Sequence, residues 1–157
     1  MKLRPLHGVL LVALVIAGII GAQYVFEGGA ARASYIQVRP DQQGDVNIDL
    51  GDLANGNVRF YRFLNHANQE IDFFVGRDSG GTVQVGFDAS EVCMKKRRGF
   101  RHDGEWMVCN FCDKAFHLKD VNADAGGCAP VAVKHRVDGS KLLLTENDLL
   151  TGWRLFH

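Results

Sequence analysis

Hydrophobic positions divide the chain into a uniformly apolar beginning and a longer part in which apolar and polar residues alternate. An uncharged, mostly aliphatic run from Gly8 to Phe26 follows the cations Lys2 and Arg4. Its length is close to the roughly 17–25 residues that a helix needs to cross a bilayer. Basic residues on its N-terminal side indicate that this end stays in the cytoplasm. We therefore expect residues 1–33 to form a single transmembrane anchor, with the rest of the chain on the other side of the membrane.

Cleavage of this segment is the alternative to an anchor. Ala31-Arg32-Ala33 has the A-x-A pattern of a signal peptidase site, so that cleavage would release a soluble domain beginning at Ser34. The apolar run is longer than the hydrophobic core of a typical signal peptide, and it ends with the bulky residues 24–26. A buried core helix is disfavoured because the run has no amphipathic face. An uncleaved anchor is therefore the favoured interpretation.

Short strands are expected after a polar linker at residues 34–45. Val46, Ile48 and Leu50 alternate with polar residues, which is typical of a half-buried strand. Further strand-like runs follow at residues 58–64, 71–75 and 83–87. Turn-type sequences at 65–68 and 78–81 separate these runs. The pattern predicts an antiparallel meander over residues 46–87.

The end of the chain repeats the spacing of this first strand and the turn after it. The matching positions are Val46-x-Ile48, Asp52-Leu53, Gly56 and Phe60 in one copy, and Leu142-x-Leu144, Asp148-Leu149, Gly152 and Phe156 in the other. Each copy predicts a strand, a short helical or 3₁₀ turn, a glycine stop and an aromatic side chain; a chance match is the alternative. We expect two equivalent units on either side of one core. The predicted fold class is α+β, mainly β, with a cysteine-rich segment inserted in a domain of residues 46–157.

Charge and cysteine content narrow the function. The chain has 18 Lys and Arg residues against 18 Asp and Glu residues, so there is no global basic field for a nucleic-acid backbone. Four cysteines are too few for a disulfide scaffold, but they equal the number of ligands in a closed tetrathiolate site. No catalytic triad, phosphate loop or carboxylate pair indicates an enzyme.

The four cysteines have a regular arrangement. Fifteen residues separate Cys93 from Cys109, and fifteen separate Cys112 from Cys128. Cys109 and Cys112 form a C-x-x-C pair, in which a tight turn directs two thiolates at one ion while backbone N–H groups bond to the sulfurs. Gly127 permits a close backbone approach beside Cys128. The pattern predicts a metal centre with Cys93, Cys109, Cys112 and Cys128 as ligands.

Thiolates suit several occupants, and spacing does not choose among them. Zinc, copper(I), single iron and iron–sulfur clusters are all compatible, although zinc ribbons usually have two C-x-x-C pairs. Two structural disulfides are one alternative, since an exported domain meets oxidising conditions. In that case, or with a structural zinc ion, the cysteines would only stabilise the fold of a module that binds a protein partner. A redox-active dithiol of Cys109 and Cys112, as in a thiol–disulfide oxidoreductase, is another; it lacks the βαβ context of a thioredoxin-like fold.

Imidazoles and carboxylates near the cysteines are weaker ligand candidates. They are His102, His117, His135, Asp88 and Glu91. Asp88 is equally well explained as a cap at a strand end, and His117 as a polar residue at the end of another strand.

The segment from Phe87 to Pro130 resembles the FtrD-like family of membrane iron–sulfur proteins. The family has F-D-A-C-x-x-C, G-Y/F, M-V-C-x-x-C and G-G-C-N-P elements in this order. Here they are found as Phe87-Asp88-Ala89-Ser90-Glu91-Val92-Cys93, Gly99-Phe100, Met107-Val108-Cys109-Asn110-Phe111-Cys112 and Gly126-Gly127-Cys128-Ala129-Pro130. The similarity extends from about Val46 to Phe156.

The resemblance implies a single-pass protein of the bacterial inner membrane, with its C-terminal domain in the periplasm. It implies an iron–sulfur cofactor and, as partner, a permease or redox protein of a metal-uptake system. It implies an electron-transfer or metal-handling accessory rather than an enzyme. Two positions depart from the pattern, since Ser90 replaces the first cysteine of the opening pair and Ala129 replaces the asparagine of the last element.

Overall fold

A computed structural model describes residues 15–16, 34–123 and 126–157. The chain divides into two compact units, Met1–Ala33 and Ser34–His157. The predicted anchor lies outside the described residues, apart from Val15 and Ile16, which are helical. None of the helices in the described ranges has both the length and the apolar composition that crossing a bilayer requires.

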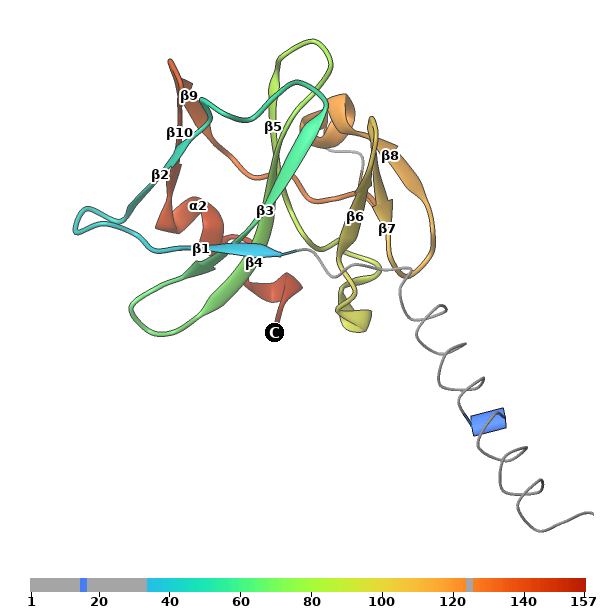
Figure 1. The fold of residues 1–157 in the computed structure, drawn as a ribbon. Helices are drawn as coiled ribbons and strands as arrows, with labels where there is room; N and C mark the ends of the chain where they lie inside the picture. The colour runs from blue at the N-terminus through green and yellow to red at the C-terminus, as the bar shows by residue number, and fades with distance from the viewer. Residues whose placement is uncertain (1–14, 17–33, 124–125) are drawn as a thin grey trace, which may run out of the picture. The chain divides into compact units, whose positions relative to one another are not determined.

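Strands dominate the C-terminal unit, as the sequence predicts (Figure 1). Within the described residues they form three sheets, which we call the central, outer and cysteine sheets. The central sheet has the order β1-β3-β4-β5 and contains β1 (Tyr35–Val38), β3 (Asn57–Leu64), β4 (Glu70–Arg77) and β5 (Val83–Phe87). The outer sheet has the order β2-β10-β9 and contains β2 (Asp45–Asp49), β10 (Lys141–Thr145) and β9 (Arg136–Asp138). The cysteine sheet contains β6 (Phe100–Asp103), β7 (Trp106–Cys109) and β8 (Ala115–His117) in that order.

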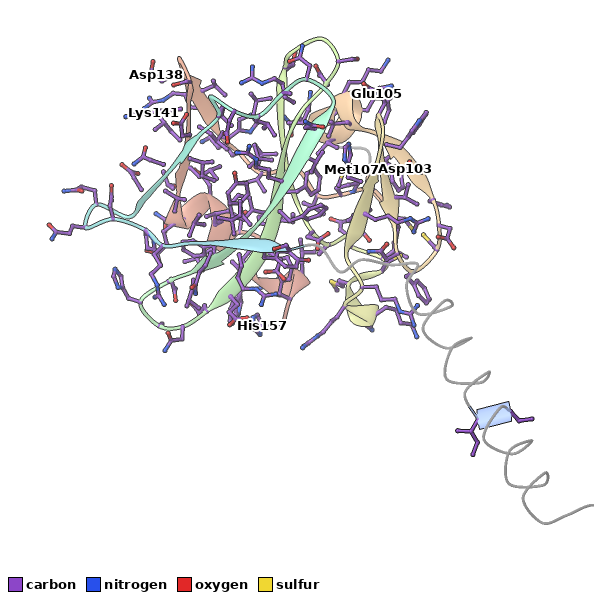
Figure 2. The ribbon with its side chains drawn as sticks, viewed as in Figure 1. Asp103, Glu105, Met107, Asp138, Lys141 and His157 are labelled. Atoms are coloured by element: carbon purple, nitrogen blue, oxygen red, sulfur yellow. The ribbon has the colours of Figure 1, made fainter. Side chains whose placement is uncertain are left out.

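Among the described residues of this unit, helical structure is limited to short segments. They are α2 (Glu146–Leu150) and the 3₁₀ helices η1 (Met94–Lys96), η2 (Leu118–Ala123) and η3 (Trp153–Leu155). Asp138 and Lys141 oppose each other beside the turn of the β9–β10 hairpin, well away from the cysteine sheet (Figure 2).

The meander of the central sheet is confirmed for β3, β4 and β5. In its first turn, Asn65 Oδ1 accepts hydrogen bonds from the backbone N–H groups of Ala67 and Gln69, both at 2.9 Å. In the second turn, Asp78 Oδ1 accepts from the N–H of Thr82 at 2.8 Å. Such side-chain bonds to nearby backbone amides are the reason that Asn and Asp favour turns. The turns are therefore specified locally.

The prediction that the first strand belongs to this meander is wrong. β2 pairs antiparallel with β10, which places Val46 opposite Leu144 and Ile48 opposite Leu142. The two copies of the repeat are therefore neighbours in one sheet, instead of lying on either side of a core. Their apolar side chains still enter a common core.

Only the second copy of the repeat has the predicted helical turn. Thr145 caps α2 by accepting a hydrogen bond from the N–H of Asp148 at 3.1 Å. The equivalent position in the first copy is Asp49, whose Oδ1 accepts from Gly51, only two residues later, at 2.8 Å. A bond to the second following residue closes a turn, whereas a bond to the third opens a helix.

Residues 34–45, for which the sequence predicts a linker, include a strand. β1 pairs in parallel with β3, with Tyr35 beside Phe60 and Val38 beside Phe63. The C-terminal unit begins at Ser34, and β1 places a strand within residues 34–45.

The central sheet separates two hydrophobic cores. Because side chains alternate along a strand, Tyr61 and Phe73 face the first core, while Phe60 and Phe74 face the second. The outer sheet and α2 lie on the side of the first core, and the cysteine sheet and η2 lie on the side of the second (Figure 1). Gly86 allows η2 to approach closely, since a Cβ atom there would lie 2.9 Å from a methyl carbon of Val121.

Candidate metal centre

Three thiols converge at one edge of the second core. The Sγ atom of Cys93 lies 3.6 Å from that of Cys128 and 3.9 Å from that of Cys112. All three sulfur atoms lie within 4.8 Å of one another. They come from separate segments, namely the N-cap of η1, the turn after β7 and the turn after η2. Convergence of three distant thiols is what a metal centre requires.

The Cys93 segment is held in place by hydrogen bonds to Ser90. The N–H of Cys93 donates to Ser90 Oγ at 3.2 Å, and the N–H of Met94 donates to the carbonyl of Ser90 at 3.0 Å. The chain then leaves η1 through Arg97, which has φ of 49°. Ser90 is 1% exposed and therefore anchors the segment to the interior.

The Cys128 turn is hydrogen-bonded to the Cys93 segment. The N–H of Val92 donates to the carbonyl of Gly127 at 3.4 Å, which ties the two loops together. Gly126 and Gly127 have φ of 61° and 65°, a region that residues with a Cβ atom rarely adopt. The two glycines thus permit the turn that brings Cys128 to Cys93.

Cys109 lies apart from the group of three, although it belongs to the same core. It is the last residue of β7, is 2% exposed and packs in the second core with Cys93. Burial raises the pKa of its thiol, while the backbone amides of Cys112 and Phe111 act in the opposite direction. Both residues belong to the turn that follows Cys109.

The pKa values of the Cys93 and Cys112 thiols are shifted in opposite directions. The backbone amide of Lys114 holds the pKa of the Cys112 thiol below its usual range, because a hydrogen bond to the thiolate favours the charged form. Burial, in contrast, raises the pKa of the Cys93 thiol. Cys112 and Cys128 are half-buried and form the more accessible side of the group.

All four cysteines are free thiols. The sulfur separations of 3.6 and 3.9 Å are well above the sulfur–sulfur bond length of a disulfide, which is about 2.05 Å. Neutral thiols gain little from packing sulfur against sulfur, whereas thiolates at this spacing repel unless a cation lies between them. The donor set therefore fits a soft, thiolate-binding metal.

The imidazole and carboxylate candidates do not join the thiols. In the described part of the chain, the group of close metal-binding side chains contains cysteines alone. The ring of His117 lies 4.9 Å from that of Trp106. His135 Nδ1 lies 2.9 Å from the carbonyl oxygen of Val133. His102 and Glu91 belong to β6 and to the loop before η1 and are likewise outside the group.

Asp88 has a different partner, which the sequence does not reveal. Its carboxylate accepts a hydrogen bond from the Tyr35 hydroxyl and one from the N–H of Phe100 at 2.6 Å. Phe100 opens β6 and pairs with Cys109 on β7, so Asp88 connects β1 to the cysteine sheet. Burial raises the pKa of Asp88 to about 7. No local pattern marks this contact, because it joins residues 53 positions apart.

Comparison with known proteins gives one match. A family model described as "Membrane iron-sulfur containing protein FtrD-like" matches residues 53–156, which include all four cysteines. Neither the curated proteins nor the solved structures contain a significant match.

Proposed function

The chain belongs to the FtrD-like family of membrane iron–sulfur containing proteins, and from this we propose that it is a membrane-anchored electron-transfer or metal-handling accessory of a metal-uptake system. Its metal centre is ligated by Cys93, Cys109, Cys112 and Cys128. The observation that carries this proposal is the convergence of three thiols from separate segments within 4.8 Å. The fourth thiol, Cys109, is buried beside them in the same core.

The protein shields one side of the centre and opens the other. Phe100, Met107 and Leu118 are each at most 3% exposed and cover the side of Cys93 and Cys109. Cys112 and Cys128 are half-buried, so electrons or an ion would enter and leave on their side. When bound, a thiolate-ligated iron supplies one-electron chemistry, and its potential depends on hydrogen bonds to sulfur and on exposure to solvent. The backbone amides of Phe111 and Lys114 favour the charged forms of the Cys109 and Cys112 thiols, as such hydrogen bonds would.

Residues 1–33 form the anchor in this proposal, and the C-terminal unit works on the periplasmic side of a bacterial inner membrane. The partner is a permease or redox protein of an iron or copper transport system. Support for this part comes from the uncharged run between Gly8 and Phe26, the cations before it and the membrane family.

Metal analysis tests the centre directly. The full chain is purified anaerobically in a nonionic detergent, and bound metal is measured together with the visible absorbance. We expect the wild type to retain metal and Cys112→Ser to lose most of it. His117→Ala is the matched control, because this imidazole is outside the thiol group and its loss should leave the metal content unchanged. Wild-type protein that holds no metal and has two disulfides would refute the proposal.

The transport role needs a separate measurement in cells. Uptake of radioactive iron and copper is compared among cells with the wild-type chain, with Cys112→Ser and with no chain. The proposal predicts that Cys112→Ser behaves like the deletion at equal protein level. Equal uptake in all three strains would reject the transport role while leaving the metal centre untouched.

A further inference from the structure

The spacing of the three converging sulfurs distinguishes kinds of thiolate centre. In a tetrahedral site with metal–sulfur bonds of about 2.3 Å, any two sulfurs are about 3.8 Å apart. The measured separations from Cys93 to Cys128 and to Cys112 are 3.6 and 3.9 Å. One separation is slightly shorter and the other slightly longer than the value for a single ion, so both agree with it.

A sulfide-bridged cluster requires a wider arrangement. In a four-iron cluster each cysteine binds its own iron, and the thiolates point outward from the cluster. In a two-iron cluster each iron takes two cysteines, so any three cysteines include at least one on the other iron. The 4.8 Å limit that encloses Cys93, Cys112 and Cys128 leaves no room for bridging sulfide between two of them. The donor atoms do not fit a multi-iron cluster.

The fourth ligand position is supplied within the C-x-x-C turn. Cys109 precedes the turn, and its backbone is fixed by hydrogen bonds of Cys109 N–H to the carbonyl of Lys114 at 2.9 Å and of Asp113 N–H to the carbonyl of Cys109 at 3.0 Å. Cys109 is buried in the same core as Cys93, and Cys112 packs against this core. Cys109 is therefore the thiol available to complete a tetrahedral set with the other three.

We propose that this chain binds a single tetrahedral ion, Zn²⁺ or iron, through four thiolates, and that it holds no sulfide-bridged cluster. The proposal rests on the ligand set of the proposed function and makes its occupant more specific. A single iron on four thiolates is compatible with the family description, since iron is then bound to sulfur. Ser90 is consistent with this conclusion, because four thiolates complete a tetrahedral coordination sphere without it, and its hydroxyl accepts a hydrogen bond from the Cys93 N–H.

Stoichiometry tests the proposal. Metal and acid-labile sulfide are measured per chain on the anaerobically purified full-length protein. We expect one zinc or iron ion and no labile sulfide. Zinc gives a colourless protein, whereas a single ferric ion gives visible sulfur-to-iron charge-transfer bands, so the same sample distinguishes the two ions. Two or more irons with a matching amount of sulfide would overturn the single-ion inference while supporting a metal centre. A metal-free protein would instead refute the proposed function itself.

Cobalt substitution tests the ligand count independently of any activity. Co²⁺ replaces the native ion, and the visible d–d bands report the geometry while the near-ultraviolet bands report the number of thiolates. The wild type should show a tetrahedral spectrum with four thiolates. Cys109→Ser should lose about a quarter of the sulfur-to-cobalt intensity, and His117→Ala should match the wild type. A Cys109→Ser spectrum identical to that of the wild type would overturn the assignment of Cys109.

Discussion

The buried carboxyl of Asp88 makes the stability of the fold depend on pH. Asp88 is 6% exposed, and burial raises its pKa from 3.8 to about 7 in spite of hydrogen bonds from Tyr35 and Phe100. Below pH 3.8 the Asp88 carboxyl is protonated in both the folded and the unfolded state, so the free energy of unfolding is not reduced by its burial. Between 3.8 and about 7 only the folded state retains it, so folding loses about 1.4 kcal/mol for each pH unit. The total loss above the folded pKa is about 4 kcal/mol.

Asp88→Asn removes this dependence. Asparagine is neutral at every pH and keeps an oxygen that accepts from the N–H of Phe100. We expect the difference in unfolding free energy between the variant and the wild type to change by about 4 kcal/mol from pH 4 to pH 7.5, in favour of the variant. Urea unfolding followed by the fluorescence of Trp106 and Trp153 measures it at each pH. Subtracting the two curves cancels contributions from groups that both proteins share, the thiols included.

The control removes a carboxyl that does not share these surroundings. Asp103→Asn changes the net charge equally, and its side chain is exposed at the end of β6 (Figure 2). The unfolding free energy of this variant should change with pH in the same way as that of the wild type. If Asp88→Asn also ran parallel to the wild type between pH 4 and 7.5, the assignment of a raised pKa to the buried carboxyl would be wrong.

Two further substitutions test the supports around the cysteines. Gly99 has φ of 61°, and a Cβ atom there would lie 2.7 Å from Cγ of Asp88, so Gly99→Ala should cost about 3 kcal/mol. Gly104 has nearly the same φ, 58°, with nothing near a Cβ atom, so Gly104→Ala should cost only about 1 kcal/mol; equal losses in denaturant unfolding would remove the steric argument. Ser90→Ala leaves the buried N–H of Cys93 without its acceptor and should cost about 1 kcal/mol in the same assay, and an unchanged midpoint would show that this hydrogen bond contributes nothing.

The parts of the fold that the sequence predicts correctly are local. The turns at Asn65 and Asp78 depend on side chains that bond to amides two to four residues away. Interactions over such short distances are encoded by the residues that make them, so composition and spacing suffice.

The parts that the sequence predicts wrongly depend on long-range pairing. β2 has the alternation of a strand, but the alternation is the same whether its neighbour is β3 or β10, which begins at Lys141. The segment of β1 has only four residues, too few to show a repeating alternation, and it becomes a strand because β3 offers a free edge. The contact between Tyr35 and Asp88 has no local signal at all. Spacing places four cysteines in one segment, but the separation of Cys109 from the other three depends on the core around it.

The division of the interior into two cores predicts which part of the fold needs the metal. Among the described residues, the first core contains no cysteine, whereas the second contains Cys93 and Cys109, with the other two cysteines packed against it. A chelator should therefore loosen the cysteine sheet and leave β3, β4 and the outer sheet folded, because local stability follows the contacts of each part. In hydrogen exchange, the amide of Val108 should lose protection by at least tenfold on metal removal, while those of Phe63 and Leu142 should change by less than a factor of three. A uniform loss of protection at all three amides would mean that the two cores unfold as one unit, and that the central sheet does not separate them energetically.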